Sequence, residues 1–192
     1  MKRLLPLLLV LLLLSGCAAK PSIRPADLTK DEQTLLRMFD QNYPSQVFDF
    51  TAPEGAVGLI IRRQQLQEGA WVSASYYLPV TEKTGRIAIS FDDLAQGLHC
   101  AILQDGEVQS TASQRHGAAD KNDDIFTATE ILKNAADAAL NTEIPLLMQL
   151  HTVGNEMPFP GASMADYPNA AAFAAYDAAY LITATFTDKP LV

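Results

Sequence analysis

The sequence predicts an α+β domain with a mainly antiparallel sheet of about eight strands and three helices. Apolar residues alternate with polar ones over much of 46–113, which is the periodicity of strands with one buried face. Asp105 and Gly106 separate two such runs, as a tight hairpin turn does. Helical spacing of apolar residues occurs at the start and in the second half of the chain. A β-sandwich or jelly roll with helical insertions is the alternative.

The first helix is expected over 28–43. Thr29 and Glu32 have the spacing of a capping box, in which the hydroxyl and the carboxylate satisfy backbone N–H groups of the first turn. Pro44 ends the helix, because the residue before a proline disfavours helical geometry. Its apolar stripe consists of Leu35, Leu36, Met38 and Phe39.

The alternating region contains six expected strands, at 47–51, 57–67, 70–78, 86–91, 98–103 and 108–113. Glu68 and Gly69 form a plausible two-residue turn between the second and third of these. Asp105-Gly106 supplies the positive φ values of a type I′ turn, which predicts a hairpin that pairs Leu103 with Val108.

The second half alternates between helices and strands. We expect a helix over 128–140 opened by Thr127 and Glu130, a strand over 144–153, a loop over 154–168, a helix capped by Asn169, and a strand over 181–187. The core is expected to include Leu35, Phe39, Leu59, Ile61, Ile87, Ile89, Cys100, Ile102, Leu147 and Phe186.

The amino terminus has the features of a secretory leader. Lys2 and Arg3 precede an apolar run over 4–14, which is too short to span a bilayer of roughly 30 Å as a helix. The run ends in Leu14-Ser15-Gly16-Cys17, which resembles the lipobox of bacterial lipoproteins.

The resemblance implies cleavage before Cys17, a diacylglycerol on its sulfur, and fatty chains such as palmitate that hold the protein on the extracytoplasmic face of a membrane. It divides the chain into a signal peptide at 1–16, a lipidated cysteine with its tether at 17–27, and a single globular domain at 28–192. Two fatty chains anchor a protein stably without a spanning segment. The alternatives of inner and outer membrane remain open, and an ordinary secreted protein is the competing interpretation.

Loss of the leader removes Lys2 and Arg3, so the formal net charge changes from −8 to −10. A surface of this sign repels phosphate backbones, and we therefore expect no nucleic-acid partner. With Cys17 committed to lipid, Cys100 is the other cysteine, and no internal disulfide is expected.

Metal and cofactor motifs fail on spacing. Asp120, Asn122 and Asp124 resemble the start of a calcium loop, but Ile125 and Ile131 occupy the positions that require glycine and glutamate. The histidines His99, His116 and His151 lack zinc-site spacing. No dinucleotide or phosphate-binding motif is present, so no cofactor is expected.

Two functions are weighed. The first is a non-catalytic domain that binds an envelope protein, a peptide or a glycan, and the second is an envelope hydrolase with an unrecognised site around Asp92, His116 or Ser163. Ser163 lies in a loop and lacks the flanking strand and final glycine of a nucleophile elbow.

The loop over 154–168 is the expected partner contact, because long structureless loops in compact domains are usually functional or disordered. Its apolar side chains are Met157, Phe159, Met164 and Tyr167. The alternative is that these side chains cover one end of the core.

Overall fold

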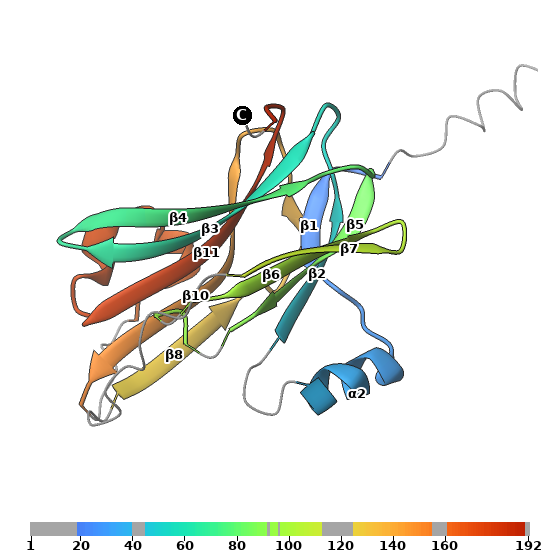
Figure 1. The fold of residues 1–192 in the computed structure, drawn as a ribbon. Helices are drawn as coiled ribbons and strands as arrows, with labels where there is room; N and C mark the ends of the chain where they lie inside the picture. The colour runs from blue at the N-terminus through green and yellow to red at the C-terminus, as the bar shows by residue number, and fades with distance from the viewer. Residues whose placement is uncertain are drawn as a thin grey trace, which may run out of the picture.

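The computed structural model describes residues 19–39, 45–91, 93–95, 97–112, 125–154 and 161–190 of the chain. They form two antiparallel sheets that face each other (Figure 1). Sheet A consists of β1 (Ser22–Pro25), β2 (Ser45–Thr51), β5 (Thr84–Ser90), β6 (His99–Gln104), β7 (Glu107–Ala112) and β9 (Ala136–Asp137), in the order β7-β6-β5-β2-β1-β9.

Sheet B consists of β3 (Gly58–Gln67), β4 (Ala70–Pro79), β8 (Ile125–Ile131), β10 (Glu143–Val153) and β11 (Ala178–Thr187), in the order β4-β3-β11-β10-β8. The helical elements are the α-helix α2 (Lys30–Phe39) and the 3₁₀ turns η1 (Met164–Asp166) and η2 (Ala170–Phe173). In Figure 1, α2 lies at one end of sheet A, away from sheet B.

The prediction of a mainly antiparallel β structure is confirmed. The expected numbers are not, because the described part of the chain has eleven strands and one α-helix, where about eight strands and three helices were expected. Two sheets that pack on a shared core are closer to the β-sandwich alternative than to a single sheet with helices.

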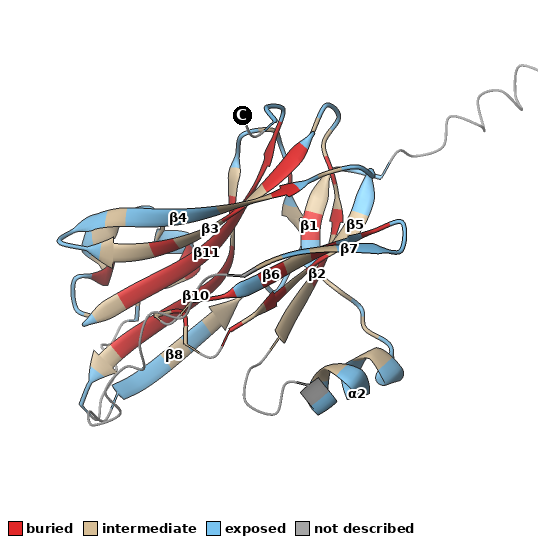
Figure 2. Cartoon of the chain, viewed as in Figure 1, coloured by how far each residue is buried: buried red, intermediate tan, exposed pale blue. Residues whose placement is uncertain are grey.

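The main core lies between the sheets (Figure 2). Alternate residues are buried in β2, β5 and β6 of sheet A, whereas β10 and β11 in the middle of sheet B are buried at almost every position. Eight of the predicted core residues are buried: Leu59, Ile61, Ile87, Ile89, Cys100, Ile102, Leu147 and Phe186. The prediction for Leu35 is wrong, because this side chain is 54% exposed on α2. The side chain of Phe39 lies outside the described part of the structure.

Both predicted hairpin turns are confirmed. Leu103 pairs with Val108, and the turn residues Asp105 and Gly106 have φ values of 46° and 78°. The same pair of positive φ values occurs at Glu68 (50°) and Gly69 (78°), between β3 and β4. The sequence predicts these hairpins correctly because Asp-Gly and Glu-Gly place glycine where a side chain would be strained.

The capping box of α2 is also confirmed. Glu32 Oε2 accepts from the Thr29 backbone N–H at 2.7 Å, and the Glu32 N–H donates to the Thr29 hydroxyl at 3.3 Å. The helix begins at Lys30, two residues later than expected, and its predicted last turn at 40–43 is outside the described residues.

The predicted helix over 128–140 is wrong, because β8 and β9 occupy this segment. Ile125, Thr127, Thr129 and Ile131 are β-branched at every second position, which favours a strand. All seven residues of β8 pair with β10. Glu130 does not cap a helix, and its carboxylate accepts from the Met164 N–H at 2.8 Å.

The prediction of a third α-helix after Asn169 is also wrong, because a short 3₁₀ turn occupies its start. Asn169 does act as a cap, since its side chain accepts from the Ala171 N–H, but the turn that follows is the short η2. β11 begins at Ala178, three residues before the strand expected over 181–187, and it pairs with β3 on one side and β10 on the other.

The predicted tether over 17–27 contains a strand. Ile23 in β1 is fully buried and pairs with Phe50, and β1 lies between β2 and β9. Pro21 and Pro25 favour an extended chain, and Ile23, the single apolar side chain between them, is too weak a signal to predict a strand.

Candidate functional site

Sheet A has an outer face that points away from the core. In β2, β5 and β6 the buried residues alternate with outward-facing ones, so Val47, Asp49, Arg86, Ala88 and Ala101 lie on this outer face. The face carries two hollows with different chemistry, which we name the polar pocket and the apolar groove.

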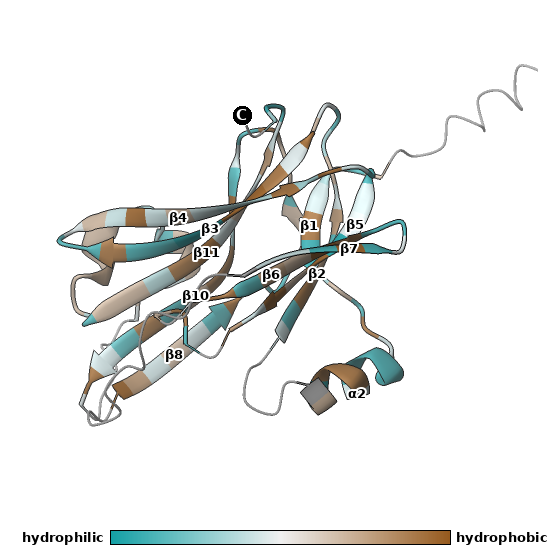
Figure 3. Ribbon diagram, in the orientation of Figure 1, coloured by the Kyte–Doolittle hydropathy of each residue, from teal (hydrophilic) through white to brown (hydrophobic). Residues whose placement is uncertain are grey.

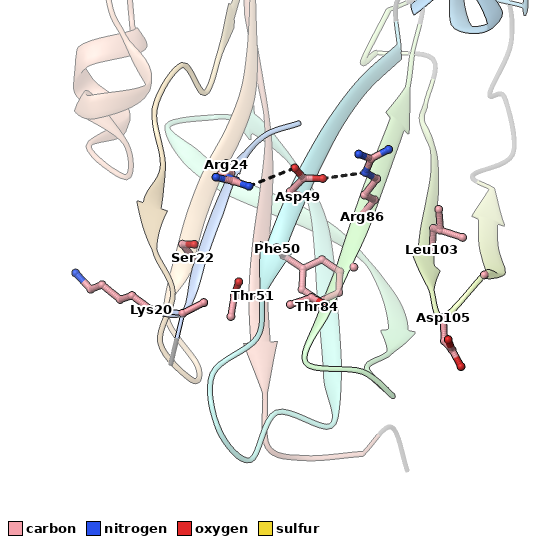
Figure 4. Close-up of a pocket in the computed structure, with 13 residues that line it drawn as sticks. Lys20, Ser22, Arg24, Asp49, Phe50, Thr51, Thr84, Arg86, Leu103 and Asp105 are labelled. Atoms are coloured by element: carbon pink, nitrogen blue, oxygen red, sulfur yellow. Dashed lines mark hydrogen bonds and ion pairs between the residues drawn. The ribbon is translucent and has the colours of Figure 1, made fainter. Parts of the chain in front are cut away.

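The polar pocket has a volume of about 560 Å³ and lies at the end of sheet A away from α2 (Figure 4). Its charged lining comes from Lys20, Arg24, Asp49, Arg86 and Asp105. Ser22, Thr51 and Thr84 add hydroxyl groups. The pocket therefore presents both signs of charge within one hollow, together with neutral hydrogen-bonding groups.

A chain of ion pairs crosses the floor of the polar pocket. Asp49 lies 3.7 Å from the Arg24 guanidinium and 2.9 Å from Nε of Arg86. Arg86 continues the chain through Nη1, which donates to Glu32 on α2. This last bond fastens α2 to the sheet.

Hydrogen bonds set the charge state of this link. Those from the Thr29 N–H, the Arg86 guanidinium and the Thr29 hydroxyl lower the pKa of Glu32 to about 2. The hydrogen bonds to Glu32 and Asp49 raise the pKa of Arg86 above its ordinary value. The link is therefore ionised on both sides at neutral pH.

The apolar groove, about 310 Å³ in volume, lies between α2 and sheet A. Its apolar lining comes from Leu28, Leu35 and Leu36 on the helical side and from Val47, Ala88, Ala101, Ile102, Leu103 and Val108 of the sheet. Leu35 is 54% exposed and Val108 is 67% exposed. Figure 3 shows the hydrophobic segment of α2 among polar ones. The groove is thus an apolar surface depression whose lining side chains are partly exposed to solvent.

The two hollows are neighbours, because Arg86 and Leu103 line both of them. Together they make one surface that is charged at the Lys20 end and apolar at the α2 end. Such a surface can hold a ligand or segment with a polar part and an apolar part.

A second polar cluster lies on the inner face of sheet B. Arg63 Nη1 donates to the Leu94 carbonyl at 2.8 Å, and the Leu94 N–H donates to the Gln149 side chain at 2.8 Å. His151 is 7% exposed, and its Nε2 lies 3.6 Å from Asp93. These contacts hold the turn at 93–95 against sheet B. Among the described residues, His151 Nε2 has no hydrogen-bond partner.

The loop residues predicted as partner contacts divide into two pairs. Met157 and Phe159 lie outside the described residues. Met164 is 9% exposed in a second apolar cluster on the outer face of sheet B, and Tyr167 packs edge-on against Trp71 at 5.3 Å. Met164 and Tyr167 therefore pack over the outer face of sheet B, apart from the main core between the sheets.

Tyr167 also closes a polar network. Its hydroxyl donates to Glu143 at 2.7 Å and accepts from Gln64 at 3.0 Å, while the Thr183 hydroxyl donates to Glu143 at 2.6 Å. Gln64 also donates to Glu143 at 3.0 Å. Burial raises the pKa of Glu143, but the hydrogen bonds from Thr183, Tyr167 and Gln64 outweigh burial, so the pKa lies below its ordinary value. Burial and the hydrogen bond to the Glu143 carboxylate raise the pKa of Tyr167 above its ordinary value.

The residues weighed for a hydrolase are not assembled within the described structure. Ser163 caps η1, and its hydroxyl donates to Asp166 at 3.1 Å. Asp92 and His116 lie outside the described residues, as do Cys17 and the calcium-loop candidates Asp120, Asn122 and Asp124. Within the part of the chain that is described, no group of His, Cys, Asp and Glu is arranged to hold a metal ion.

Sequence reasoning missed the outer face of sheet A. The apolar residues that form this face lie in segments that are far apart in the sequence. The stripe around Leu35 is expected in the core, and Val47, Ala88 and Ala101 alternate with the buried residues of their strands. Only the pairing of β2 with β5 and of β5 with β6 brings these three onto one face.

No protein-family model, curated protein or solved structure matches the chain. Among the residues described, no helix combines the length and the apolar character needed to cross a membrane.

Proposed function

We propose that this protein is a lipid-anchored component of a bacterial cell envelope whose extracytoplasmic domain binds a partner or ligand and does not catalyse a reaction. The observation that carries the binding role is the apolar groove between α2 and sheet A. A concave hollow with a mostly apolar lining is the usual form of a binding site.

The contrast between the two outer faces supports this assignment. On sheet B, the segment at 161–177 brings Met164 and Phe173 over the strands and buries their apolar side chains. On sheet A, the described chain places only α2 near the face, and Leu103 and Val108 remain exposed beside it. A bound partner would supply on sheet A the cover that sheet B obtains from its own chain.

The envelope location is proposed from Leu14-Ser15-Gly16-Cys17. Replacement of Cys17 by Ala removes the sulfur that would carry the lipid. We expect the variant to remain as an uncleaved precursor without incorporated fatty-acid label. Normal processing and labelling of Cys17→Ala would contradict the anchor.

The binding role is tested with a photo-crosslinking amino acid at Val108, in the intact protein in its native envelope. A discrete adduct is expected, and it should disappear when Ala101→Phe fills the groove. The same photo-crosslinker at Val153, which is 57% exposed on sheet B, is the matched control. No adduct at Val108, or an adduct that is unchanged by Ala101→Phe, would contradict binding in the groove.

An envelope hydrolase is the other candidate, and the contact between Asp93 and His151 is the observation that favours it. A catalytic histidine needs a nucleophile or a water within hydrogen-bond reach. In the described structure no hydroxyl or thiol is bonded to His151 Nε2. His151→Gln separates the two functions, since a hydrolase would lose ester turnover and a binding domain has no turnover to lose.

A further inference from the structure

The free edge of sheet B carries a further interaction surface. We propose that β4 pairs with β4 of a second copy of this chain, edge to edge and antiparallel, so that two copies of sheet B join into one continuous sheet. β4 is the first strand in the order β4-β3-β11-β10-β8, so β3 is its neighbour on one side and no described strand pairs with it on the other (Figure 1). Neither the groove nor the lipid anchor is needed for this pairing.

β4 lacks the features that keep exposed edges from pairing. Edge strands are ordinarily protected by charged residues, prolines, bulges or short length. The ten residues of β4 contain no charge, its proline is the last residue, and its register with β3 has no bulge. The other edge strands of the described sheets are shorter, and each carries an acidic residue: Glu107 in β7, Glu130 in β8 and Asp137 in β9. β4 is therefore the described edge at which a chain of negative net charge meets itself with least repulsion.

The direction of the free backbone groups follows from the hairpin of β3 and β4. A two-residue turn is closed by a hydrogen-bonded pair, here Gln67 with Ala70, and such pairs then recur at every second residue. The bond of 3.0 Å from the Val80 N–H to the Val57 carbonyl has the same phase. The backbone groups of the even-numbered residues of β4 therefore bond to β3, and those of the odd-numbered residues point away from it. The odd-numbered residues are Trp71, Ser73, Ser75, Tyr77 and Pro79.

The free part of the edge ends at Pro79. Its carbonyl accepts from the Gln104 side chain at 3.0 Å, and Gln104 accepts in turn from the Thr81 N–H. Among the described residues, no hydrogen bond reaches the outward backbone N–H groups of Ser73 and Ser75. Figure 2 shows this part of β4 exposed. Unpaired N–H and C=O groups on extended backbone are a template for another strand.

A second copy fits this template because the edge is self-complementary. An antiparallel pairing with Ala74 on the two-fold axis sets Ser73 opposite Ser75 of the second copy. The same register sets Trp71 opposite Tyr77, so all outward-facing residues of the free edge are joined and each pair can exchange two backbone hydrogen bonds. The side chains at the centre are alanine and serine, which allow close approach, and no like charges face each other.

Disulfide formation across the two-fold axis tests this register. In Ala74→Cys the two Cα atoms would lie about 4.5 Å apart, within the range of a disulfide. The full-length protein is produced with two different epitope tags in the same cells and is oxidised in its native envelope. We expect a disulfide-linked dimer that carries both tags. The wild type, which contains Cys17 and Cys100, gives the background.

Val72→Cys is the matched control, because Val72 is exposed on the same strand and the same face. In the proposed register the two copies of this residue would be on the order of 14 Å apart, which is too far for a disulfide. We expect at least fivefold less dimer than from Ala74→Cys. Equal yields from the two variants, or no dimer from Ala74→Cys, would overturn the pairing.

Charge placed on the edge provides a second test. Ser73→Lys together with Ser75→Lys, both at exposed positions, would set lysine opposite lysine across the axis. We expect this background to reduce the Ala74→Cys dimer at least fivefold. Glu107→Lys on β7 changes the net charge by the same amount and should leave the dimer unchanged. A dimer that the two lysines do not reduce would overturn the pairing, and a disulfide adduct to a different protein in place of the dimer would overturn the choice of a second copy.

Discussion

Tyr167 donates a hydrogen bond of 2.7 Å to Glu143, and this bond fixes the 161–177 segment to sheet B. The hydroxyl also accepts from Gln64 of β3, so one side chain joins the segment to two strands. The indole N–H of Trp71 adds a bond to the Pro168 carbonyl at 3.2 Å. The cover of sheet B is therefore held by polar bonds as well as by apolar packing.

Tyr167→Phe should lower the free energy of unfolding by about 1–3 kcal/mol, because it leaves a partly buried carboxylate short of one donor. Urea denaturation monitored by Trp71 fluorescence measures the change. Tyr77→Phe is the matched control, since its hydroxyl makes one bond of 3.1 Å to the Val57 carbonyl in a more exposed place. A larger loss for Tyr77→Phe would contradict the role given to Tyr167.

Gly85→Ala should destabilise the protein by about 1–3 kcal/mol through overpacking. A Cβ at this position would lie 2.6 Å from the Phe50 ring and 2.7 Å from the Leu103 carbonyl oxygen. The carbonyl belongs to the neighbouring strand and cannot rotate away. Gly69→Ala is the comparison, because nothing lies within 4 Å there and only its φ of 78° is unfavourable. Equal thermal stability of Gly85→Ala and the wild type would exclude the close approach of β5 and β6.

Cys100 should be unreactive in the folded protein. Burial raises the pKa of its thiol from 9.0 to about 11, partly offset by a hydrogen bond with Thr111. At pH 8 roughly one thiol in a thousand is then ionised, about a hundredfold fewer than in the unfolded chain. A thiol reagent should label Cys100 rapidly in denaturant and at least a hundredfold more slowly without it. Rapid labelling of the native protein would contradict the burial.

The raised pKa of Cys100 also makes the stability of the protein depend on pH. A pKa that is raised on folding contributes stability below the unfolded value of 9.0 and loses it as the pH rises through about 11. Cys100→Ser should therefore remove this part of the alkaline destabilisation, although it introduces a buried hydroxyl.

The link between Glu32 and Arg86 should persist in mild acid. A carboxyl whose pKa is lowered from 4.5 to about 2 contributes above its unfolded pKa and loses that contribution as the pH falls toward 2. An NMR titration should place the midpoint of Glu32 near 2 and show it higher in Arg86→Gln. Glu32→Gln should also speed amide exchange in α2 at neutral pH. Unchanged exchange in α2 would show that the link does not hold the helix.

The hairpins and the cap of α2 could be predicted from the sequence, because they depend on residues that are close in the chain. Asp105-Gly106 forms a tight turn, and Thr29 with Glu32 forms a capping box. Predictions from such local patterns failed where tertiary pairing decided the outcome. Thr127 and Glu130 have capping-box spacing, yet Thr127 pairs with His151 and Glu130 binds a backbone N–H thirty-four residues away.

The candidate site could not be predicted, because it is formed by a helix and strands that are far apart in the sequence. The apolar groove needs α2 beside a face built from β2, β5, β6 and β7, and no short window of sequence contains that arrangement. An apolar stripe on a helix does not indicate which surface the helix will cover, so the sequence predicts Leu35 in the core although this side chain is exposed. For Met164 and Tyr167, the sequence showed apolar side chains in a loop and could not show that Trp71 and Glu143 would receive them.

The position of β1 has a mechanical consequence. Ser22 follows Cys17 by five residues, which span at most roughly 17 Å. β1 is hydrogen-bonded to β2 on one side and to β9 on the other. A pull on the lipid that we propose at Cys17 would load these bonds along the strand, so that they resist in shear together and do not unzip one by one. The height and tilt of the domain above the bilayer would then follow from the direction in which β1 leaves sheet A.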